Sequence, residues 1–254
     1  MKKSIAEVNE RREYLVEFLA ETTASDIKTL AKHLDVSEMT VRRDCNVLAK
    51  MGRIKQTFGK IELIGNLDVT QNIEAIEKIK SAIAYEAASY VESGDTVFIN
   101  TSSTALMSLT YLQDKAISLL TNNIKVVHLN HNPQSTIFLT GGEVRFQKEG
   151  LSGDRAVTAF SEARSDITII GVSGVSLENG ISTSVMHEAT VNSQIVDNSG
   201  QLIVVADYRK VGTTSNFKIG ELKDISILIT DQYADKKTLD AIESLGGQVI
   251  QVFV

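Results

Sequence analysis

The spacing of hydrophobic residues divides the chain into a short helical part and a longer mixed part. In the first part, apolar residues recur every three or four positions over three segments, which predicts three helices. These are residues 6–21, a segment that begins after the N-cap Ser25, and a segment from the N-cap Ser37 to about residue 51. Polarity then alternates over 53–58 and 60–65, which predicts a small β-hairpin. This order, with a very short turn between the second and third helices, predicts a winged helix-turn-helix.

The helical phase of the third segment separates buried from outward side chains. Val41, Cys45 and Leu48 lie at i, i+4 and i+7, which places them on the inner face. The polar and basic residues of the first turns fall off this stripe, on the side that a recognition helix presents to the DNA major groove. With two lysines of the hairpin, the candidate DNA-binding residues are Ser37, Glu38, Thr40, Arg42, Arg43, Lys55 and Lys60.

Residues 66–80 are expected to connect this part to a larger domain, through a helix that continues to about Tyr90. Seven short β-branched runs follow, separated mostly by stretches of helical period. The runs are "DTVFIN", "AISLLTN", "STIFLTGG", "DITIIGVSG", "QLIVVAD", "ISILITD" and "GQVIQVFV". Such alternation predicts an α/β domain with a largely parallel, Rossmann-like sheet. The predicted domains are therefore 1–65 and 81–254.

Polar residues gather where several of these runs end, and open parallel sheets bind ligands at that edge. Three hydroxyl residues open a helical stretch, where backbone N–H groups, hydroxyls and the helix dipole together suit a phosphate. A glycine pair allows close approach of the backbone to a ligand, and a lysine offers a point charge. These residues are Ser102, Ser103 and Thr104, Gly141 and Gly142, and Lys210. Each also has an ordinary structural explanation, as a helix cap, a turn or a surface charge.

Composition limits the kinds of function. The 254-residue chain has a net charge of −6, yet residues 1–61 hold 12 Lys and Arg against 9 Asp and Glu, so the helical part alone is basic. The single cysteine excludes an intramolecular disulfide and a cysteine-built metal site, and the four histidines lack metal-ligand spacing. With no apolar run long enough for a membrane span and no secretion signal, we expect a cytoplasmic protein without a cofactor.

Long stretches of the chain resemble a known family. "DIKTLAKHLDVSEMTVRRDCNVLAKMGRIKQTFGK" resembles the DNA-binding domain of the DeoR family of bacterial transcriptional regulators, in which a VS-x-x-T-[IV]-R-R-D pattern is typical. The remainder is similar to that family's sensor domain, an α/β fold related to ribose-5-phosphate isomerase, in "NTSSTA", "LLTNN", "FLTGGEVR", "GVSGVSLENGIST", "HEATVNSQIV" and "VVADYRKVG". The resemblance covers nearly the whole chain. It implies an oligomeric repressor that leaves operator DNA when a phosphorylated sugar binds the second domain.

Mapped onto this chain, the resemblance extends the set of effector-binding candidates. They are Asn100, Ser102, Ser103, Thr104, Thr121, Asn122, Gly141, Gly142, Glu188 and Lys210. Three positions of the second domain depart from the family's pattern: Asn100 and Ser102 stand where an Asp and a Gly are usual, and Asn192 stands where a lysine is common. In the wing, Gln56, Phe58 and Lys60 replace the usual Arg, His and Gly. The departures in the second domain leave open a different effector or a weakened response.

Three hypotheses for function follow from the residues. The first is a DNA-binding regulator with a sugar-phosphate sensor, acting as a homodimer or higher homo-oligomer. The second is a sugar-phosphate isomerase or related enzyme with a fused helical domain, and the third is a protein that regulates through protein contacts alone. The "TVRRD" stretch on an outward helix face favours the first, and Asn100 lacks the acid/base capacity that an isomerase requires.

Overall fold

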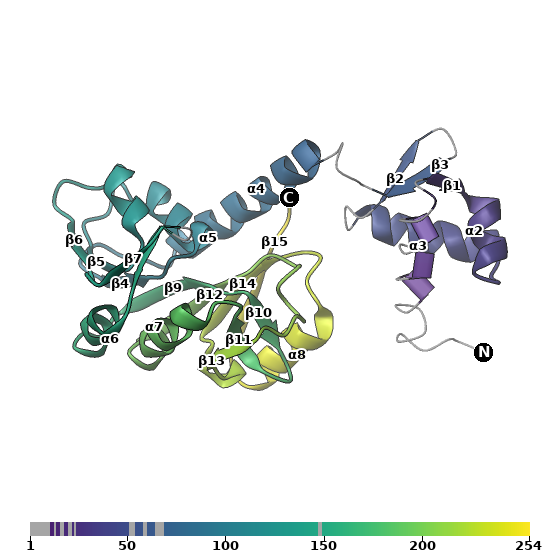
Figure 1. Ribbon diagram of the computed structural model, residues 1–254. Coiled ribbons are helices and arrows are strands. Elements are labelled where there is room, and N and C mark those ends of the chain that lie inside the picture. The colour runs from purple at the N-terminus through teal and green to yellow at the C-terminus, as the bar shows by residue number, and fades with distance from the viewer. Residues whose placement is uncertain are drawn as a thin grey trace. The chain divides into compact units, whose positions relative to one another are not determined.

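A computed structural model describes residues 11–12, 14–15, 18–19, 22, 24–50, 54–57, 60–63, 69–146 and 149–254 of the chain (Figure 1). The chain forms two compact units, Met1–Ala75 and Ile76–Val254. The boundary falls inside helix α4 (Val69–Ala88), so the two units share one continuous helix.

The N-terminal unit contains helices packed on a three-stranded antiparallel sheet with the order β1-β3-β2. The described residues from Arg11 to Thr22 are helical. The other elements are β1 (Ala24–Asp26), α2 (Ile27–His33), α3 (Glu38–Lys50), β2 (Ile54–Thr57) and β3 (Lys60–Leu63). The predicted helices and the hairpin are confirmed, and together they form a winged helix-turn-helix.

Two details at the start of α2 differ from the prediction. Residues 24–26 form the short strand β1, in which Ser25 pairs with Ile61 of β3. The N-cap is therefore Asp26 rather than Ser25, and its Oδ1 accepts a hydrogen bond from the Thr29 backbone N–H at 2.8 Å. Sequence alone did not distinguish two adjacent residues that both cap well, and the pairing with β3 decides between them.

The core of this unit holds apolar residues from the segments with helical spacing and from the alternating hairpin strands. Its fully buried members are Leu15, Leu19, Leu30, Val41, Cys45, Leu48, Ile54 and Ile61. Burial raises the pKa of the Cys45 thiol to about 11, with a smaller contribution from the neighbouring Asp44 charge. The thiol therefore stays protonated and packs as a small core residue. Val8, Gly52 and Gly59 lie outside the described residues.

The C-terminal unit is built on a seven-stranded sheet with the order β15-β14-β12-β9-β4-β5-β6, in which every pair is parallel. The strands are β4 (Thr96–Ile99), β5 (Ser118–Thr121), β6 (Thr136–Leu139), β9 (Ile167–Gly171), β12 (Gln201–Val205), β14 (Ile227–Asp231) and β15 (Gln248–Val252). Each lies in one of the seven predicted runs, and the parallel sheet is confirmed. The strand order reverses between β4 and β9, which makes their junction the topological switch point.

Helices cover both faces of this sheet, as Figure 1 shows. They are α4 from Ile76 on, α5 (Ser103–Met107), α6 (Asp154–Ser161), α7 (Met186–Asp197) and α8 (Lys236–Ser244), with the 3₁₀ turns η1 (Ser108–Tyr111), η2 (Ile124–His128) and η3 (Leu222–Asp224). In β4, Val97 and Ile99 join one buried cluster while Phe98 joins the other. Because both faces of the inner strands are buried, those strands read as continuous apolar runs. None of the described helices is long and apolar enough to cross a membrane.

Two small antiparallel sheets were not predicted. One contains β10 (Gly174–Ser176), β11 (Gly180–Thr183) and β13 (Phe217–Gly220), and the other contains β7 (Glu143–Arg145) and β8 (Gly150–Ser152). Their strands have three or four residues, and all except β7 include a glycine, so they carry little local strand signal.

Candidate functional site

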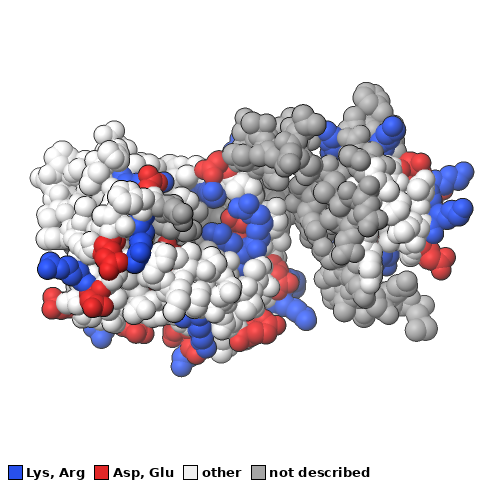
Figure 2. Space-filling view, in the orientation of Figure 1, with Lys and Arg blue, Asp and Glu red and all other residues white. Residues whose placement is uncertain are grey.

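The outward face of α3 carries the residues expected to meet DNA. Ser37 caps the helix, because its Oγ accepts a hydrogen bond from the Thr40 N–H at 3.2 Å. Arg42 and Arg43 are exposed, as are Ser37 and Glu38, whereas Thr40 is half-buried. Figure 2 shows basic side chains standing out from the described surface of the N-terminal unit, with an acidic one beside them. The structure therefore gathers these residues on one accessible helix face, and their contact with DNA stays a prediction.

The hairpin lysines lie on the solvent side of the wing. Strand β2 pairs with β3 so that Lys55 faces Glu62 and Thr57 faces Lys60. Because side chains alternate along a strand, Lys55 and Lys60 share one face while Ile54 and Ile61 share the buried one. Both lysines are exposed.

Asp44, which sequence reasoning did not select, anchors the recognition helix. Its side chain is 3% exposed and accepts from Arg11 Nη2 at 2.7 Å and from Arg12 Nε at 2.9 Å. The two arginines belong to the first helical segment, so the carboxylate ties that segment to α3. Asp44 is more than thirty residues away from both arginines in the sequence, so no local pattern indicated this contact.

A cavity of about 270 Å³ lies in the C-terminal unit, at the switch point of the sheet. Its size and position fit a small ligand. Five predicted effector residues line it, namely Asn100, Ser102, Ser103, Glu188 and Lys210. It is also lined by residues that sequence reasoning missed, among them Thr101, Lys125, Glu149, Ser173 and Thr183.

Asn100 organises the base of this cavity. Its Nδ2 donates to Gly171 O at 2.9 Å and to Asn192 Oδ1 at 3.2 Å. Its Oδ1 accepts from the N–H groups of Gly171 and Ser102, both at 3.2 Å. Asn100 and Asn192 are 1% and 3% exposed, so two departures from the family's pattern meet as one buried, neutral amide pair. The pair joins the ends of β4 and β9 to α7.

Ser102, the third departure of the second domain from the family's pattern, is accommodated by Gly171. Ser102 is the N-cap of α5, and its Oγ accepts from the Ala105 N–H at 3.3 Å. A Cβ placed on Gly171 would lie only 1.9 Å from Ser102 Oγ, so the serine occupies space that a glycine leaves open. Ser102 therefore fits the fold without displacing the loop.

Glu188 presents a carboxylate to the cavity from the first turn of α7. Its Oε1 accepts from Thr101 Oγ1 at 3.0 Å, and its Oε2 accepts from Thr183 Oγ1 at 3.4 Å. These threonine hydroxyls hold the carboxylate in place, and its other lone pairs suit sugar hydroxyls.

The other five predicted effector residues do not line the cavity. They are Thr104, Thr121, Asn122, Gly141 and Gly142. Thr104 is buried in α5, Thr121 donates its hydroxyl to Ile99 O at 2.6 Å, and Asn122 Nδ2 donates to Leu151 O at 3.0 Å. The glycine pair has positive φ values of 69° and 112° in the turn before β7. A Cβ at Gly142 would lie 2.4 Å from Ser152 O, so its close backbone neighbour is the chain's own β8.

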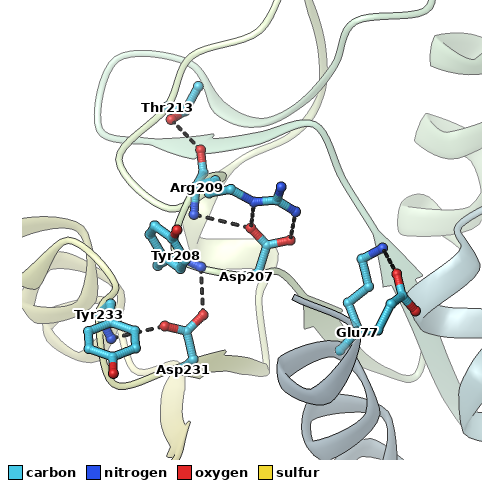
Figure 3. Close-up of polar contacts among 8 residues, drawn as sticks. Glu77, Asp207, Tyr208, Arg209, Thr213, Asp231 and Tyr233 are labelled. Carbon is cyan, nitrogen blue, oxygen red and sulfur yellow. Dashed lines mark hydrogen bonds and ion pairs between the residues drawn. The ribbon is translucent and has the colours of Figure 1, made fainter. Parts of the chain in front are cut away.

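The loop that carries Lys210 is held by two buried aspartates (Figure 3). Asp207 Oδ1 accepts from Arg209 Nε at 2.7 Å and its Oδ2 from Arg209 Nη2 at 2.9 Å. Burial alone would raise the pKa of Asp207, but the hydrogen bonds and charge of Arg209 outweigh it and lower that pKa below its usual value. Asp231 accepts the N–H groups of Tyr208 and Tyr233 at 2.7 and 2.9 Å, and burial raises its pKa despite these bonds.

In the described part of the chain, no cluster of three or more His, Cys, Asp or Glu side chains is close enough together to bind a metal ion.

Together, a winged helix-turn-helix with an exposed basic helix face and a parallel α/β unit with a switch-point cavity define a two-part DNA-binding regulator. Comparison with known protein families supports this class: the family model of the DeoR-like helix-turn-helix domain matches residues 11–66, and that of the DeoR C terminal sensor domain matches residues 76–232. The chain belongs to the DeoR family of transcriptional regulators.

The chain is similar over most of its length to curated members of this family. It is 28% identical to the HTH-type transcriptional repressor CsqR of Escherichia coli, with 88% of each chain covered. It is 28% identical to the glycerol-3-phosphate regulon repressor of Haemophilus influenzae, covering 87% of this chain and 88% of that one. It is 26% identical to the HTH-type transcriptional repressor GlcR of Bacillus subtilis, with 95% of each covered.

Among solved structures, ribose 5-phosphate isomerase from Plasmodium falciparum is similar to 53% of this chain and 52% of its own, with 18% identity and a TM-score of 0.39. A likeness of that size carries no information about function.

Proposed function

We propose that this protein is a repressor of a carbohydrate-utilisation operon that binds operator DNA through α3 and the wing, and that a phosphorylated sugar in the switch-point cavity releases it. The observation that carries the proposal is the meeting of two features in one chain. Arg42 and Arg43 stand exposed on the first turns of α3, and a polar cavity with Lys210 at its rim lies in the unit that matches the sensor domain.

The DNA-binding half is supported by the chemistry of the exposed face. An arginine in the first turns of a recognition helix reaches base edges or phosphates, and a bidentate contact to guanine contributes about 1–3 kcal/mol of discrimination. We assign this role to Arg42 and Arg43, with support from Ser37, Glu38 and Thr40, and phosphate contacts to Lys55 and Lys60.

The sensing half is supported by the residues that share the cavity. Ser102, Ser103 and Lys210 supply donors and a positive charge for phosphate, while Asn100 and Glu188 suit sugar hydroxyls, which need polar partners once they lose water. The effector weakens DNA binding only by preferring the arrangement that does not bind, so coupling of about 1–3 kcal/mol is expected.

Regulation rather than catalysis is the role that we propose for the cavity. An isomerase needs a group that takes and returns a proton at the substrate carbon. Here Asn100, at the base of the cavity, is a neutral amide and cannot take a proton from carbon. As a regulator of operator DNA, the protein is expected to work in the cytoplasm and to need no cofactor.

The test measures binding to DNA from upstream of the protein's own gene by fluorescence anisotropy, with and without hexose, pentose and polyol phosphates. We expect specific binding that at least one sugar phosphate weakens. The Arg42→Ala/Arg43→Ala double variant should lose specific binding while its melting temperature stays unchanged. Lys223→Ala/Lys236→Ala, which removes two exposed charges from the larger unit, is the matched control and should bind as the wild type does. Unchanged operator affinity in the folded arginine variant would contradict the DNA-binding assignment.

A further inference from the structure

The cavity extends across the carboxyl ends of four adjacent strands and has a lysine at each end. Lys125 follows β5 in η2, and Lys210 follows β12. Strands β4 and β9 lie between β5 and β12, so the two outer strand ends are about 14 Å apart, at about 4.8 Å per strand. Two lysine side chains therefore reach the cavity from opposite sides of the switch point.

We infer that the cavity takes a small hydroxylated ligand with an anionic group at each end, Lys125 binding one group and Lys210 the other. Sugar bisphosphates and phosphorylated sugar acids both have this chemistry. The inference rests on the proposed function and narrows its effector to one class. It also adds Lys125, which no motif indicated, to the residues that determine specificity.

The partner of Lys125 makes an exchange with a ligand feasible. Lys125 forms an ion pair with Glu149, and the two side chains are 47% and 50% exposed. An ion pair this exposed contributes little to stability, so it is a weak competitor for the ammonium group. A phosphate carries up to two charges and three acceptor oxygens, and binds a lysine more strongly than one carboxylate does. Glu149 therefore keeps the charge balanced in the empty cavity and gives way to an anionic ligand.

The middle of the cavity suits hydroxyls rather than a third anion. Asn100, Ser102 and Ser103 are neutral, and the central carboxylate of Glu188 repels negative charge. At the far end, Asp207 is paired with Arg209 through two hydrogen bonds, and the charge of Lys210 also contributes to lowering its pKa. The order across the cavity is thus cation, hydroxyl-binding centre, cation.

Matched ligand pairs test this inference on the full-length protein by isothermal titration calorimetry. Fructose 6-phosphate is compared with fructose 1,6-bisphosphate, glucose 6-phosphate with glucose 1,6-bisphosphate, and glucose 6-phosphate with 6-phosphogluconate. In at least one pair we expect the doubly anionic ligand to bind about tenfold more tightly, the gain of one charge-assisted contact. Whether a bisphosphate or a sugar acid gives the larger gain identifies the second anionic group.

Two variants assign the effect to one residue. Lys125→Gln should reduce the preference to within about threefold and leave monophosphate affinity unchanged, since one charge-assisted contact is lost. Lys218→Gln is the matched control, because Lys218 is 43% exposed and pairs with Glu221, which is 53% exposed, outside the cavity. It should keep the full preference. Glu149→Gln removes the competing carboxylate and should strengthen binding of the doubly anionic ligand.

The possible results separate this inference from the proposed function. If monophosphates bind and no doubly anionic ligand binds better, or if Lys125→Gln keeps the preference, the inference is wrong and the proposed function stands. If no phosphorylated compound binds the folded protein, both fail. A preference that Lys125→Gln removes and Lys218→Gln retains supports the inference.

Discussion

Asn100 shows how one residue sets the charge at the base of the cavity. Both hydrogens of its amide nitrogen point at acceptors, Gly171 O and Asn192 Oδ1, and its oxygen takes two backbone N–H groups. An aspartate would satisfy the N–H groups but would place a second oxygen against the two acceptors. The neutral amide is therefore the side chain that fits opposite Asn192.

We predict that Asn100→Asp destabilises the protein at neutral pH by about 1–3 kcal/mol or more, the cost of an unsatisfied buried polar group that is also charged. The pKa of the new carboxyl would be raised above its unfolded value. The folded state is then favoured at low pH, and the deficit should shrink as pH falls through the raised pKa. Urea unfolding from pH 5 to 8 measures this. Asn132→Asp, where Oδ1 accepts the Gln134 N–H, should show almost no change.

Asp207 differs from an aspartate at position 100, because the hydrogen bonds and charge of Arg209 outweigh the effect of burial and lower its pKa. A lowered carboxylate pKa contributes stability above the unfolded value, about 3.9, and that contribution is lost as pH falls through the folded value. Arg209→Gln should therefore cost about 1–2 kcal/mol at pH 7, after allowance for the half-exposed arginine. Thermal unfolding should show this cost shrinking progressively as pH falls below about 4. A cost that stays constant down to pH 3 would contradict the role assigned to the ion pair. Lys236→Gln, which breaks an exposed pair with Asp240, is the control and should have little effect at any pH.

At the scale of elements, the recognition helix depends on a helix far away in sequence. Asp44 lies on α3 directly after Arg43, yet its side chain points to the inner side and meets Arg11 and Arg12. The orientation of the exposed arginines is thus coupled to the contact between α3 and the first helical segment.

Asp44, Arg11 and Arg12 form a largely buried ion-pair cluster. Removing one member of a buried cluster leaves the other charges uncompensated, which typically costs about 3–5 kcal/mol. Asp44→Ala should therefore lower hydrogen-exchange protection of α3 amides and weaken operator binding, while the strands of the parallel sheet keep their protection. Glu77→Ala breaks the more exposed pair between Glu77 and Lys80 and should cost less than about 1 kcal/mol. Equal protection of α3 in Asp44→Ala and in wild type would show that the cluster does not hold the helix.

At the scale of the whole molecule, one winged helix has a small footprint on DNA. Helix-turn-helix proteins usually gain affinity by binding two half-sites about one helical turn apart, so we expect a homodimer or higher homo-oligomer. Light scattering at micromolar concentration should give at least twice the monomer mass, both free and DNA-bound. Because counterions leave the DNA on binding, affinity should also fall steeply with salt. A monomer in both states would contradict this expectation.

The local pattern of the sequence determined the elements of this protein. Spacing of three to four residues indicated α2 and α3, alternation indicated the hairpin, and β-branched runs indicated all seven strands of the parallel sheet. These signals are local because a helix or strand buries a face that its own residues define. The exposed position of Arg42 and Arg43 followed from the same periodicity.

Only the tertiary structure decided which distant residues meet. Asn100 and Asn192 are 92 positions apart, and Lys125 reaches the cavity from the side opposite Lys210 because β5 and β12 lie on either side of β4 and β9. Thr121 and Asn122 end a strand at the correct edge, yet their side chains bond the chain's own backbone. A periodic pattern tells which side of an element a residue takes. It does not tell which element lies opposite, because strand order and crossovers set that contact.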